Sequence, residues 1–211
     1  KITLPLLRRA LAALTYGDLL MLLRNQTRPY EKNPGETDAL VDKWVDDICA
    51  RFLKGKGFQK KQIRTLTREI VASFDRIEIL PVKKIRVGIV GEIYAKYSPL
   101  ANNHLEDFLR SQDCEVNVPG IMAFMLFKVD NRLEDIKLYG GNPFKKFVIQ
   151  ILYDYLEVFE RYTLDAVSIS ARYHKPASYR AIKQMVRPLI GYGCKMGEGW
   201  LLTGEMIELV E

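Results

Sequence analysis

The sequence predicts an α/β protein in which a parallel sheet with flanking helices follows a helical segment. Residues 1–82 place apolar side chains at helical spacing and contain no run typical of a strand. From residue 83 onward, short apolar runs alternate with helical patterns, which is typical of a parallel sheet covered by helices on both faces. We therefore expect two domains, a helical segment over residues 1–82 and an α/β domain over residues 83–211.

Three helices are expected in the helical segment. Residues 4–23 are rich in leucine, and residues 40–52 and 63–77 each place apolar side chains on one helix face. Cys49 lies within the second of these apolar stripes, so we expect a buried thiol. The prolines and glycine of residues 25–37 predict a loop between the first two helices. This loop carries Arg28, Tyr30 and Glu31. Its residue types are equally compatible with a docking loop and with a plain connector.

The α/β part is predicted to contain three strands separated by helices. The strands are expected over residues 85–90, 114–118 and 165–170. Helices are expected to begin near Asn103, Gly120, Asn142, Ser178 and Thr203. Asn142 followed by Pro143 is a typical helix start, because asparagine caps the first turn and proline suits its first position.

The composition is that of a globular protein of the reducing cytoplasm. The 211 residues are 48% apolar and 27% charged. The most apolar stretch, residues 144–159, is interrupted by lysines and acidic residues, so we expect no membrane span. The three cysteines contain no CxxC pair, which argues against a disulfide framework and a self-contained metal site.

The net charge of +6 is concentrated in the first part of the chain. Residues 1–84 contain 17 Lys+Arg and 10 Asp+Glu, a net charge of +7, whereas residues 85–211 contain 15 and 16, a net charge of −1. The basic excess is greatest over residues 51–68, which is compatible with attraction of phosphate or with a solvated helix face. That stretch carries no recognised nucleic-acid-binding motif, so we expect no nucleic-acid binding.

The first candidate binding segment follows the first predicted strand. Ligands of open α/β sheets bind beyond the carboxyl ends of the strands, beside helix N-termini. Residues 91–103 occupy that position, and Asn103 with Glu106 resembles a capping box. The glycines do not follow GxGxxG, so cradling of a pyrophosphate is disfavoured, and both a ligand-binding loop and a structural loop remain open. The candidate ligand-binding residues are Gly91, Glu92, Tyr94, Ser98, Asn102 and Asn103.

A second candidate segment lies over residues 197–206. Glu198 stands between two glycines and Trp200 follows, which suits either a carboxylate presented to a ligand or a turn whose tryptophan packs in the core. No nucleophile–base pair and no metal-ligand cluster can be read from the sequence, so catalytic residues are not assigned.

Three motifs in order resemble a known family. These are TRPYEKNPGET, RVGIVGEIYAKYSPLANNHLEDFLRSQDCEVNVPG and GEGWLLTGEMIEL, which begin at Thr27, Arg86 and Gly197. They resemble stretches of 2-hydroxyacyl-CoA dehydratase-type proteins, above all the large proteins in which such a region accompanies an ATP-dependent acyl-CoA dehydratase activase. The likeness covers nearly the whole chain, from about Leu4 to Val210.

The resemblance implies a flavodoxin-like domain within an oxygen-sensitive iron–sulfur system. In that family, an activase uses ATP to transfer an electron to a [4Fe-4S] cluster, and the electron allows elimination from an acyl-CoA. The implied partners are therefore the ATP-dependent activase and acyl-CoA. Cluster ligands in the family are cysteines. Cys49 and Cys114 here lie in regular apolar patterns and Cys194 stands alone, so we expect a fragment that binds no complete cluster and is inactive by itself.

The resemblance also implies roles for the candidate residues. Residues of the 91–103 segment would line a cleft for substrate or cluster, Glu198 and Trp200 would form another wall, and the loop at Arg28 would fix the helical part against the cleft. A different hypothesis is also compatible with the sequence. In this alternative, the chain is a non-catalytic module that binds acyl-CoA or a nucleotide, or docks a partner.

Overall fold

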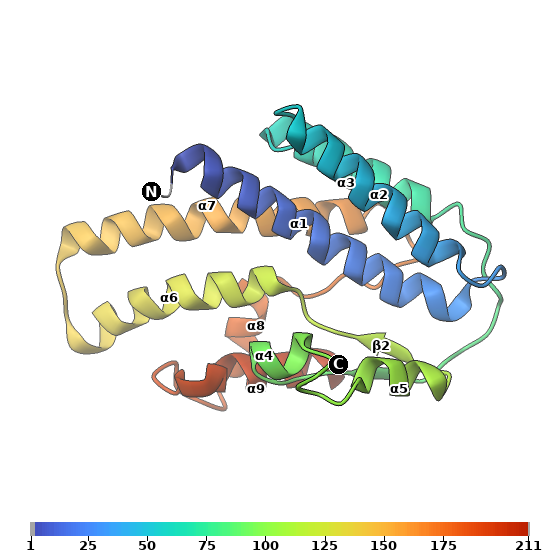
Figure 1. Cartoon of the computed structure of the whole chain (residues 1–211). Coiled ribbons are helices and arrows are strands. Elements are labelled where there is room, and N and C mark those ends of the chain that lie inside the picture. Colours follow the sequence, from blue (N-terminus) through green and yellow to red (C-terminus); the bar gives the residue numbers. More distant parts are fainter. Residues whose placement is uncertain (1–2, 211) are drawn as a thin grey trace. The chain divides into compact units, whose positions relative to one another are not determined.

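Helices account for 67% of the chain, and the strands that the structure describes form one two-stranded parallel sheet (Figure 1). This computed structural model describes residues 3–210. The prediction of a flavodoxin-like parallel sheet with flanking helices was therefore wrong. The chain divides into two units. Unit 1 comprises the described residues through Val87 with Glu106–Asn117 and Tyr162–Lys175, and unit 2 comprises Gly88–Leu105, Val118–Arg161 and the described residues from Pro176 onward.

Unit 1 contains the predicted helical segment and pieces from later in the chain. Its elements are α1 (Leu4–Thr27), η1 (Arg28–Tyr30), α2 (Glu36–Leu53), α3 (Lys60–Phe74), most of β1 (Arg86–Gly88), most of α5 (Leu105–Ser111), β2 (Glu115–Asn117) and the end of α7 (Pro143–Val167). The three helices expected before residue 82 are all present. Helix α1 packs against α3, and Leu19, Ile63 and Phe74 from these two helices are fully buried.

Helix α2 buries less of its apolar stripe than its sequence predicts. Ile48 is buried, but Val45 is 45% exposed and the Cys49 thiol is exposed, so the expectation of a buried Cys49 was wrong. Consecutive residues on a helix differ by about 100° in direction. The face that buries Ile48 therefore directs Cys49 to solvent.

The sheet is smaller than predicted because neither the first nor the third expected strand behaves as a buried central strand. A central strand of a parallel sheet needs cover on both faces. In β1, however, Arg86 and Gly88 are exposed. The third expected strand is absent, since α7 continues through Val167. Ala166 and Val167 are buried at helical spacing from Tyr162 and Phe159, so the helix period continues where a strand was expected.

Unit 2 is built from helices around an aromatic core. Its elements are α4 (Ile93–Tyr97), α6 (Ile121–Tyr139), most of α7, α8 (Tyr179–Val186), η2 (Met196–Glu198) and α9 (Gly199–Val210). The helix starts expected at Asn142 and Ser178 are confirmed. Asn142 Oδ1 accepts a hydrogen bond of 2.8 Å from Phe144 N–H, and Ser178 Oγ accepts one of 3.2 Å from Ala181 N–H.

Two further expectations concern domains and membranes. The described part of the predicted helical segment lies wholly in unit 1, whereas residues 83–211 supply parts of both units. Within residues 3–210, none of the helices combines the length and the apolar character that crossing a membrane requires.

Candidate functional site

The first candidate site lies in unit 2, where α4 meets the segment that begins α9. Glu198 Oε1 accepts a hydrogen bond of 2.8 Å from the backbone N–H of Ile93. This N–H lies in the first turn of α4, where a helix offers no acceptor of its own. The two candidate segments, residues 91–103 and 197–206, are therefore in direct contact although they lie about a hundred residues apart in the sequence.

A buried ion pair joins the same two segments a second time. Lys96 Nζ lies 2.7 Å from both carboxylate oxygens of Glu205, and the two side chains are 2% and 1% exposed. Burial raises the pKa of Glu205, the Lys96 ammonium opposes this, and the neighbouring Glu198 carboxylate raises the pKa further. Glu198, Glu205 and Lys96 therefore form one electrostatic cluster, which we call the carboxylate cluster.

The backbone at Glu198 is strained. Gly197 and Glu198 are both left-handed, with φ values of 58° and 62°. Glycine adopts this conformation freely, but a glutamate there costs about 1–2 kcal/mol. A Cβ atom at residue 197 would lie 2.6 Å from Glu92 Oε1, so only glycine allows the Glu92 carboxylate to approach so closely. Gly197 thus lets the exposed Glu92 side chain pass close to the backbone beside Glu198.

Glu198 also carries an unsatisfied oxygen. The residue is 7% exposed, and its Oε2 has no hydrogen-bond partner among residues 3–210. A buried carboxylate oxygen without a donor is costly, and such atoms cluster with strained backbone at functional sites. With Glu198 and Glu205 against a single Lys96, the cluster has a formal charge of −1. It therefore favours a ligand that donates hydrogen bonds, such as a hydroxyl or an N–H group, and repels phosphate.

The remaining residues of the 91–103 segment have local roles. Asn102 Oδ1 accepts a hydrogen bond of 3.2 Å from Leu105 N–H, so Asn102 caps α5. The capping box expected from Asn103 and Glu106 was therefore wrong, and Asn103 is instead exposed with a φ of 53°. Ser98 Oγ accepts a long hydrogen bond of 3.4 Å from Ala101 N–H. Tyr94 is 67% exposed, and Gly91 is half-buried.

Trp200 lies in the core of unit 2. Its side chain is fully buried, and its ring centroid lies 5.1–5.8 Å from those of Phe127, Tyr179 and Tyr192. The indole N–H donates a hydrogen bond of 3.3 Å to Asn131 Oδ1. The sequence was compatible with a ligand-facing segment and with a turn whose tryptophan packs in the core. In the structure, the tryptophan packs in the core.

The loop of unit 1 holds its three candidate residues in defined contacts. Arg28 Nε lies 3.3 Å from Asp38 Oδ2, and Tyr30 donates a hydrogen bond of 2.5 Å to Glu115 Oε2. The Glu31 carboxylate accepts hydrogen bonds of 2.7 and 2.8 Å from Gly35 and Thr37 N–H, which caps α2. All these contacts lie within unit 1, so they fix the loop to its own unit.

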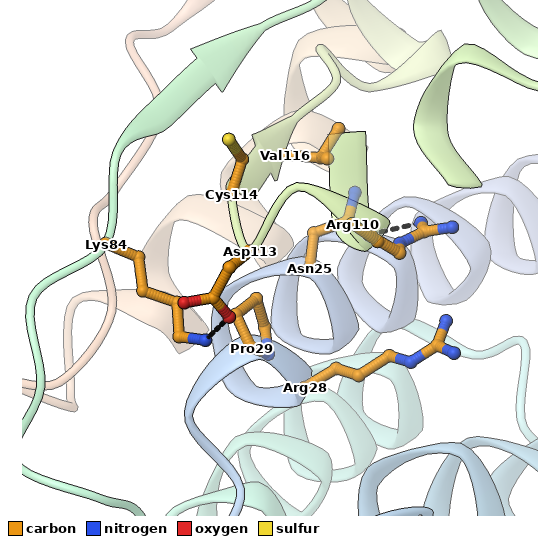
Figure 2. A pocket seen from close by; sticks show the side chains of 8 residues that line it. All are labelled: Asn25, Arg28, Pro29, Lys84, Arg110, Asp113, Cys114 and Val116. Carbon is orange, nitrogen blue, oxygen red and sulfur yellow. Dashed lines mark hydrogen bonds and ion pairs between the residues drawn. The ribbon is translucent and has the colours of Figure 1, made fainter. Parts of the chain in front are cut away.

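Arg28 also lines a pocket of unit 1. Figure 2 shows Arg28 and Arg110 on one side of Asn25, and Lys84 paired with Asp113 on the other. The pocket has a volume of about 230 Å³. We call it the basic pocket, because Arg28, Lys84 and Arg110 line it together with the single carboxylate of Asp113.

Sequence reasoning did not select Lys96, Glu205, Lys84 or Arg110 as site residues. Lys96 lies inside the candidate segment, but nothing in its spacing distinguishes a buried lysine from a solvated one. Arg110 carried a usable signal, because Glu106 precedes it by one helical turn and the pair lies 2.6 Å apart in the structure. That spacing predicts a fixed guanidinium but not the pocket in front of it.

The described residues do not fit an iron–sulfur cluster. Cys49 and Cys194 are exposed and Cys114 is half-buried, and all three are free thiols. Among residues 3–210, no three His, Cys, Asp or Glu side chains are grouped so that they could hold a metal ion. A cluster needs several cysteine ligands in one place.

The fold and the two sites define a mainly helical, two-unit protein with a buried carboxylate–lysine cluster in one unit and a basic pocket in the other. Comparison with protein-family models, curated proteins and solved structures finds no match for the chain. The resemblance to 2-hydroxyacyl-CoA dehydratase-type proteins therefore stays a prediction that rests on the three sequence motifs.

Proposed function

We propose that the chain is part of a 2-hydroxyacyl-CoA dehydratase-type protein and takes part in ATP-driven electron transfer to an acyl-CoA dehydratase or reductase system. The observation that carries the proposal is the contact between Glu198 and Ile93 N–H, reinforced by the Lys96–Glu205 pair. These contacts join the second and third motifs on which the family resemblance rests. Motifs that act on one ligand must lie together, and these two do.

The carboxylate cluster is suited to the hydroxyl group of a 2-hydroxyacyl substrate. Glu198 Oε2 is a buried acceptor to which the described residues offer no donor, and a substrate hydroxyl would supply one. Gly197 leaves room for Glu92 beside it. In this proposal, Glu198 accepts a hydrogen bond from the substrate hydroxyl, and Glu92 forms a polar wall of the site beside it. The [4Fe-4S] cluster of the proposed system would take its ligands from outside the described residues, and its ATP-dependent activase would be a separate domain or subunit.

The ligand-binding part of the proposal is tested by calorimetric titration of the chain with a 2-hydroxyacyl-CoA and with the same acyl-CoA lacking the hydroxyl. We expect the hydroxylated ligand to bind more tightly, and Glu198→Gln to remove about tenfold of that preference, the value of one hydrogen bond to a charged group. Glu69→Gln, which alters an exposed carboxylate of α3, should leave binding unchanged. Equal binding of the two ligands would reject the role of Glu198.

The electron-transfer part is tested on the complete native protein purified without oxygen. Iron and sulfide are added, and the EPR spectrum of the reduced protein is recorded with and without the activase and ATP. We expect a cluster signal that depends on the activase. A complete protein that takes up no cluster would reject the function, whatever the calorimetry shows.

A second candidate function is non-catalytic binding of acyl-CoA or a nucleotide. The observation in its favour is another pocket, distinct from the basic pocket of unit 1. It lies in unit 2 at the turn between α6 and α7 and has a volume of about 590 Å³. Arg132, Lys145 and Lys195 line it beside Tyr139, whose ring is 79% exposed. Asp135 pairs with Lys195, but the described residues offer no ion pair to Arg132 or Lys145. Two uncompensated cations beside an exposed aromatic ring suit a phosphate attached to a planar base.

The two candidate functions differ in which variant weakens binding. The double variant Arg132→Gln and Lys145→Gln should weaken binding of ADP and of acyl-CoA in the second function. The matched pair Lys60→Gln and Lys61→Gln on the exposed start of α3 should not. If binding survives the first pair and is lost in Glu198→Gln, the second candidate is excluded.

A further inference from the structure

We infer that the basic pocket of unit 1 is a binding site for a phosphate or diphosphate group. Three cationic side chains from separate elements converge on it, Arg28 from η1, Lys84 from the segment before β1, and Arg110 from α5. Asp113 is the only carboxylate among its lining residues, so the lining has a formal charge of +2. This site is independent of the carboxylate cluster, which repels phosphate.

The arginines are held in place by carboxylates that do not line the pocket. Arg28 pairs through Nε with Asp38, which Arg24 also contacts at 2.6 Å. Arg110 pairs with Glu106 at 2.6 Å and with Asp107 at 3.1 Å. Burial alone would raise the pKa of Asp38. The positive charges of Arg24, Arg28 and Arg110 outweigh burial and hold this pKa below its usual value. The guanidinium groups are therefore fixed before a ligand arrives, which reduces the entropy lost on binding.

The buried polar lining completes the geometry. Arg110 Nη2 also donates a hydrogen bond of 3.2 Å to Asn25 Oδ1, and Asn25 is 5% exposed. Among residues 3–210, the terminal nitrogens of Arg28 have no hydrogen-bond partner. Figure 2 shows the guanidinium groups of Arg28 and Arg110 extending past Asn25 in the same direction. A tetrahedral anion accepts hydrogen bonds from two such guanidinium groups readily.

Size and charge decide the class of ligand. The volume of about 230 Å³ is below the range of about 300–1,000 Å³ for pockets that enclose whole cofactors. It equals roughly eight times the volume of about 30 Å³ that one water molecule occupies in the liquid. A phosphate or diphosphate group fits this space, whereas an attached nucleoside would extend into solvent. Asp113 is 80% exposed, so its carboxylate has room to turn away from Lys84 when an anion enters.

Cys114 provides a reporter within the pocket, and the chain supplies its own controls. Cys114 lines the basic pocket, whereas Cys49 lies on α2 and Cys194 lies in unit 2. The protein is alkylated with iodoacetamide at constant ionic strength, and the rate at each cysteine is followed by peptide mass spectrometry. The added anions are inorganic phosphate, diphosphate and ADP, each compared with chloride. We expect phosphate and diphosphate to slow alkylation of Cys114 in a saturable manner and to leave Cys49 and Cys194 unaffected.

Variants of opposite sign sharpen the test. Lys84→Gln should weaken the affinity for diphosphate about tenfold, the loss of one hydrogen bond to a charged group. Asp113→Asn should strengthen it, because it removes the one negative charge of the lining. Lys32→Gln, which changes an exposed lysine of the same unit, should have no effect. Circular dichroism of each variant checks that the fold is retained.

The three anions also distinguish the sources of the phosphate group. Stronger protection by diphosphate than by ADP indicates a site for the free anion, and stronger protection by ADP indicates that the organic part contributes contacts. Either result supports the inference. Equal alkylation of Cys114 in chloride and in all three anions, or an Asp113→Asn variant that binds more weakly than the native protein, would overturn it.

Discussion

Lys96 and Glu205 form an ion pair in which each side chain is at least 98% buried, with Lys96 Nζ 2.7 Å from both carboxylate oxygens. The pair joins α4 to α9 within unit 2. Desolvation of two charges offsets much of their attraction, so such a pair adds little stability compared with apolar residues of similar size. Its strongest effect is on specificity, because any arrangement that separates the two residues leaves a buried charge without a partner.

Replacing Lys96 with methionine should strongly destabilise the protein. The change leaves Glu205 buried without its cation, and we expect a loss of about 3–5 kcal/mol in the free energy of unfolding, measured with urea. The double variant Lys96→Met and Glu205→Leu should recover most of this loss. Lys32→Met is the matched control, because Lys32 and Glu78 are also 2.7 Å apart but exposed. Its cost should be small compared with that of Lys96→Met, because solvent screens an exposed pair. Equal losses in the two single variants would contradict this account.

Two glycine-to-alanine changes within helices should have opposite signs. A Cβ atom at Gly204 in α9 would lie 2.4 Å from Ile182 Cγ2 in α8, so Gly204→Ala should destabilise the protein by about 1–3 kcal/mol through overpacking. Among the described residues, no atom beyond the backbone of α1 itself and the two chain neighbours lies within 4 Å of a Cβ added at Gly17, so Gly17→Ala should stabilise the protein by about 0.5–1 kcal/mol. Thermal unfolding measures both. In a double-mutant cycle, Gly204→Ala should cost much less when Ile182 is already alanine.

The hydrogen bond between Tyr30 and Glu115 should contribute measurably to the stability of unit 1. Burial and the Glu115 carboxylate raise the pKa of Tyr30 to about 12, so the phenol remains a donor throughout the neutral range. Tyr30→Phe removes the donor and leaves Glu115, which is 5% exposed, without it. We expect a loss of about 1.5–3 kcal/mol in urea unfolding. Tyr94→Phe alters an exposed tyrosine and should change stability by less than about 0.5 kcal/mol.

Glu160 should make stability depend on pH between about 4.5 and 7. Burial raises the pKa of Glu160 from 4.5 to about 7, although the hydrogen bond from Tyr179 N–H opposes the rise. Between these values the folded protein holds a proton that the unfolded chain has released, so stability falls as pH rises. The total effect is about 3 kcal/mol, since one pKa unit corresponds to about 1.4 kcal/mol.

Glu160→Gln tests this dependence without removing the acceptor for Tyr179 N–H. The variant should be more stable than the native protein at pH 8, and its unfolding free energy should lose the decline between pH 4.5 and 7. Urea unfolding at several pH values measures both quantities. Parallel pH profiles for the native protein and the variant would show that Glu160 does not titrate in this range.

Local patterns predicted the helices well and the sheet poorly. Asn142 and Ser178 cap the helices that their sequence context indicates, because capping depends on residues within one turn. The run at residues 165–170 was ambiguous, since a short apolar run fits a buried strand and a buried helix turn equally. Whether these residues form a strand depends on whether a neighbouring strand is available for pairing. The chain provides a helix that continues from Phe159 instead.

The candidate site was predictable in part. The sequence singled out Glu198 by its two neighbouring glycines and Glu92 by the place of its segment after the first predicted strand, and the structure brings the two segments together. It gave no reason to select Lys96 or Glu205, because the sequence pattern of a charged residue in a helix does not reveal burial. Tyr94 and Trp200 were both selected as candidate ligand-binding residues, but neither lies in the carboxylate cluster. The Tyr94 side chain is exposed, and Trp200 is buried in the core of unit 2.

Sequence patterns alone predicted the helices of the first part, the helix starts at Asn142 and Ser178, and the segments that carry Glu92, Glu198 and Arg28. These features depend on apolar periodicity, capping and glycine, all of which act over a few residues. Tertiary contacts set the small size of the sheet, the burial of Lys96 against Glu205 and the convergence of Arg28, Lys84 and Arg110. These depend on contacts between residues far apart in the chain, whose energies are set by desolvation and packing after the helices have come together.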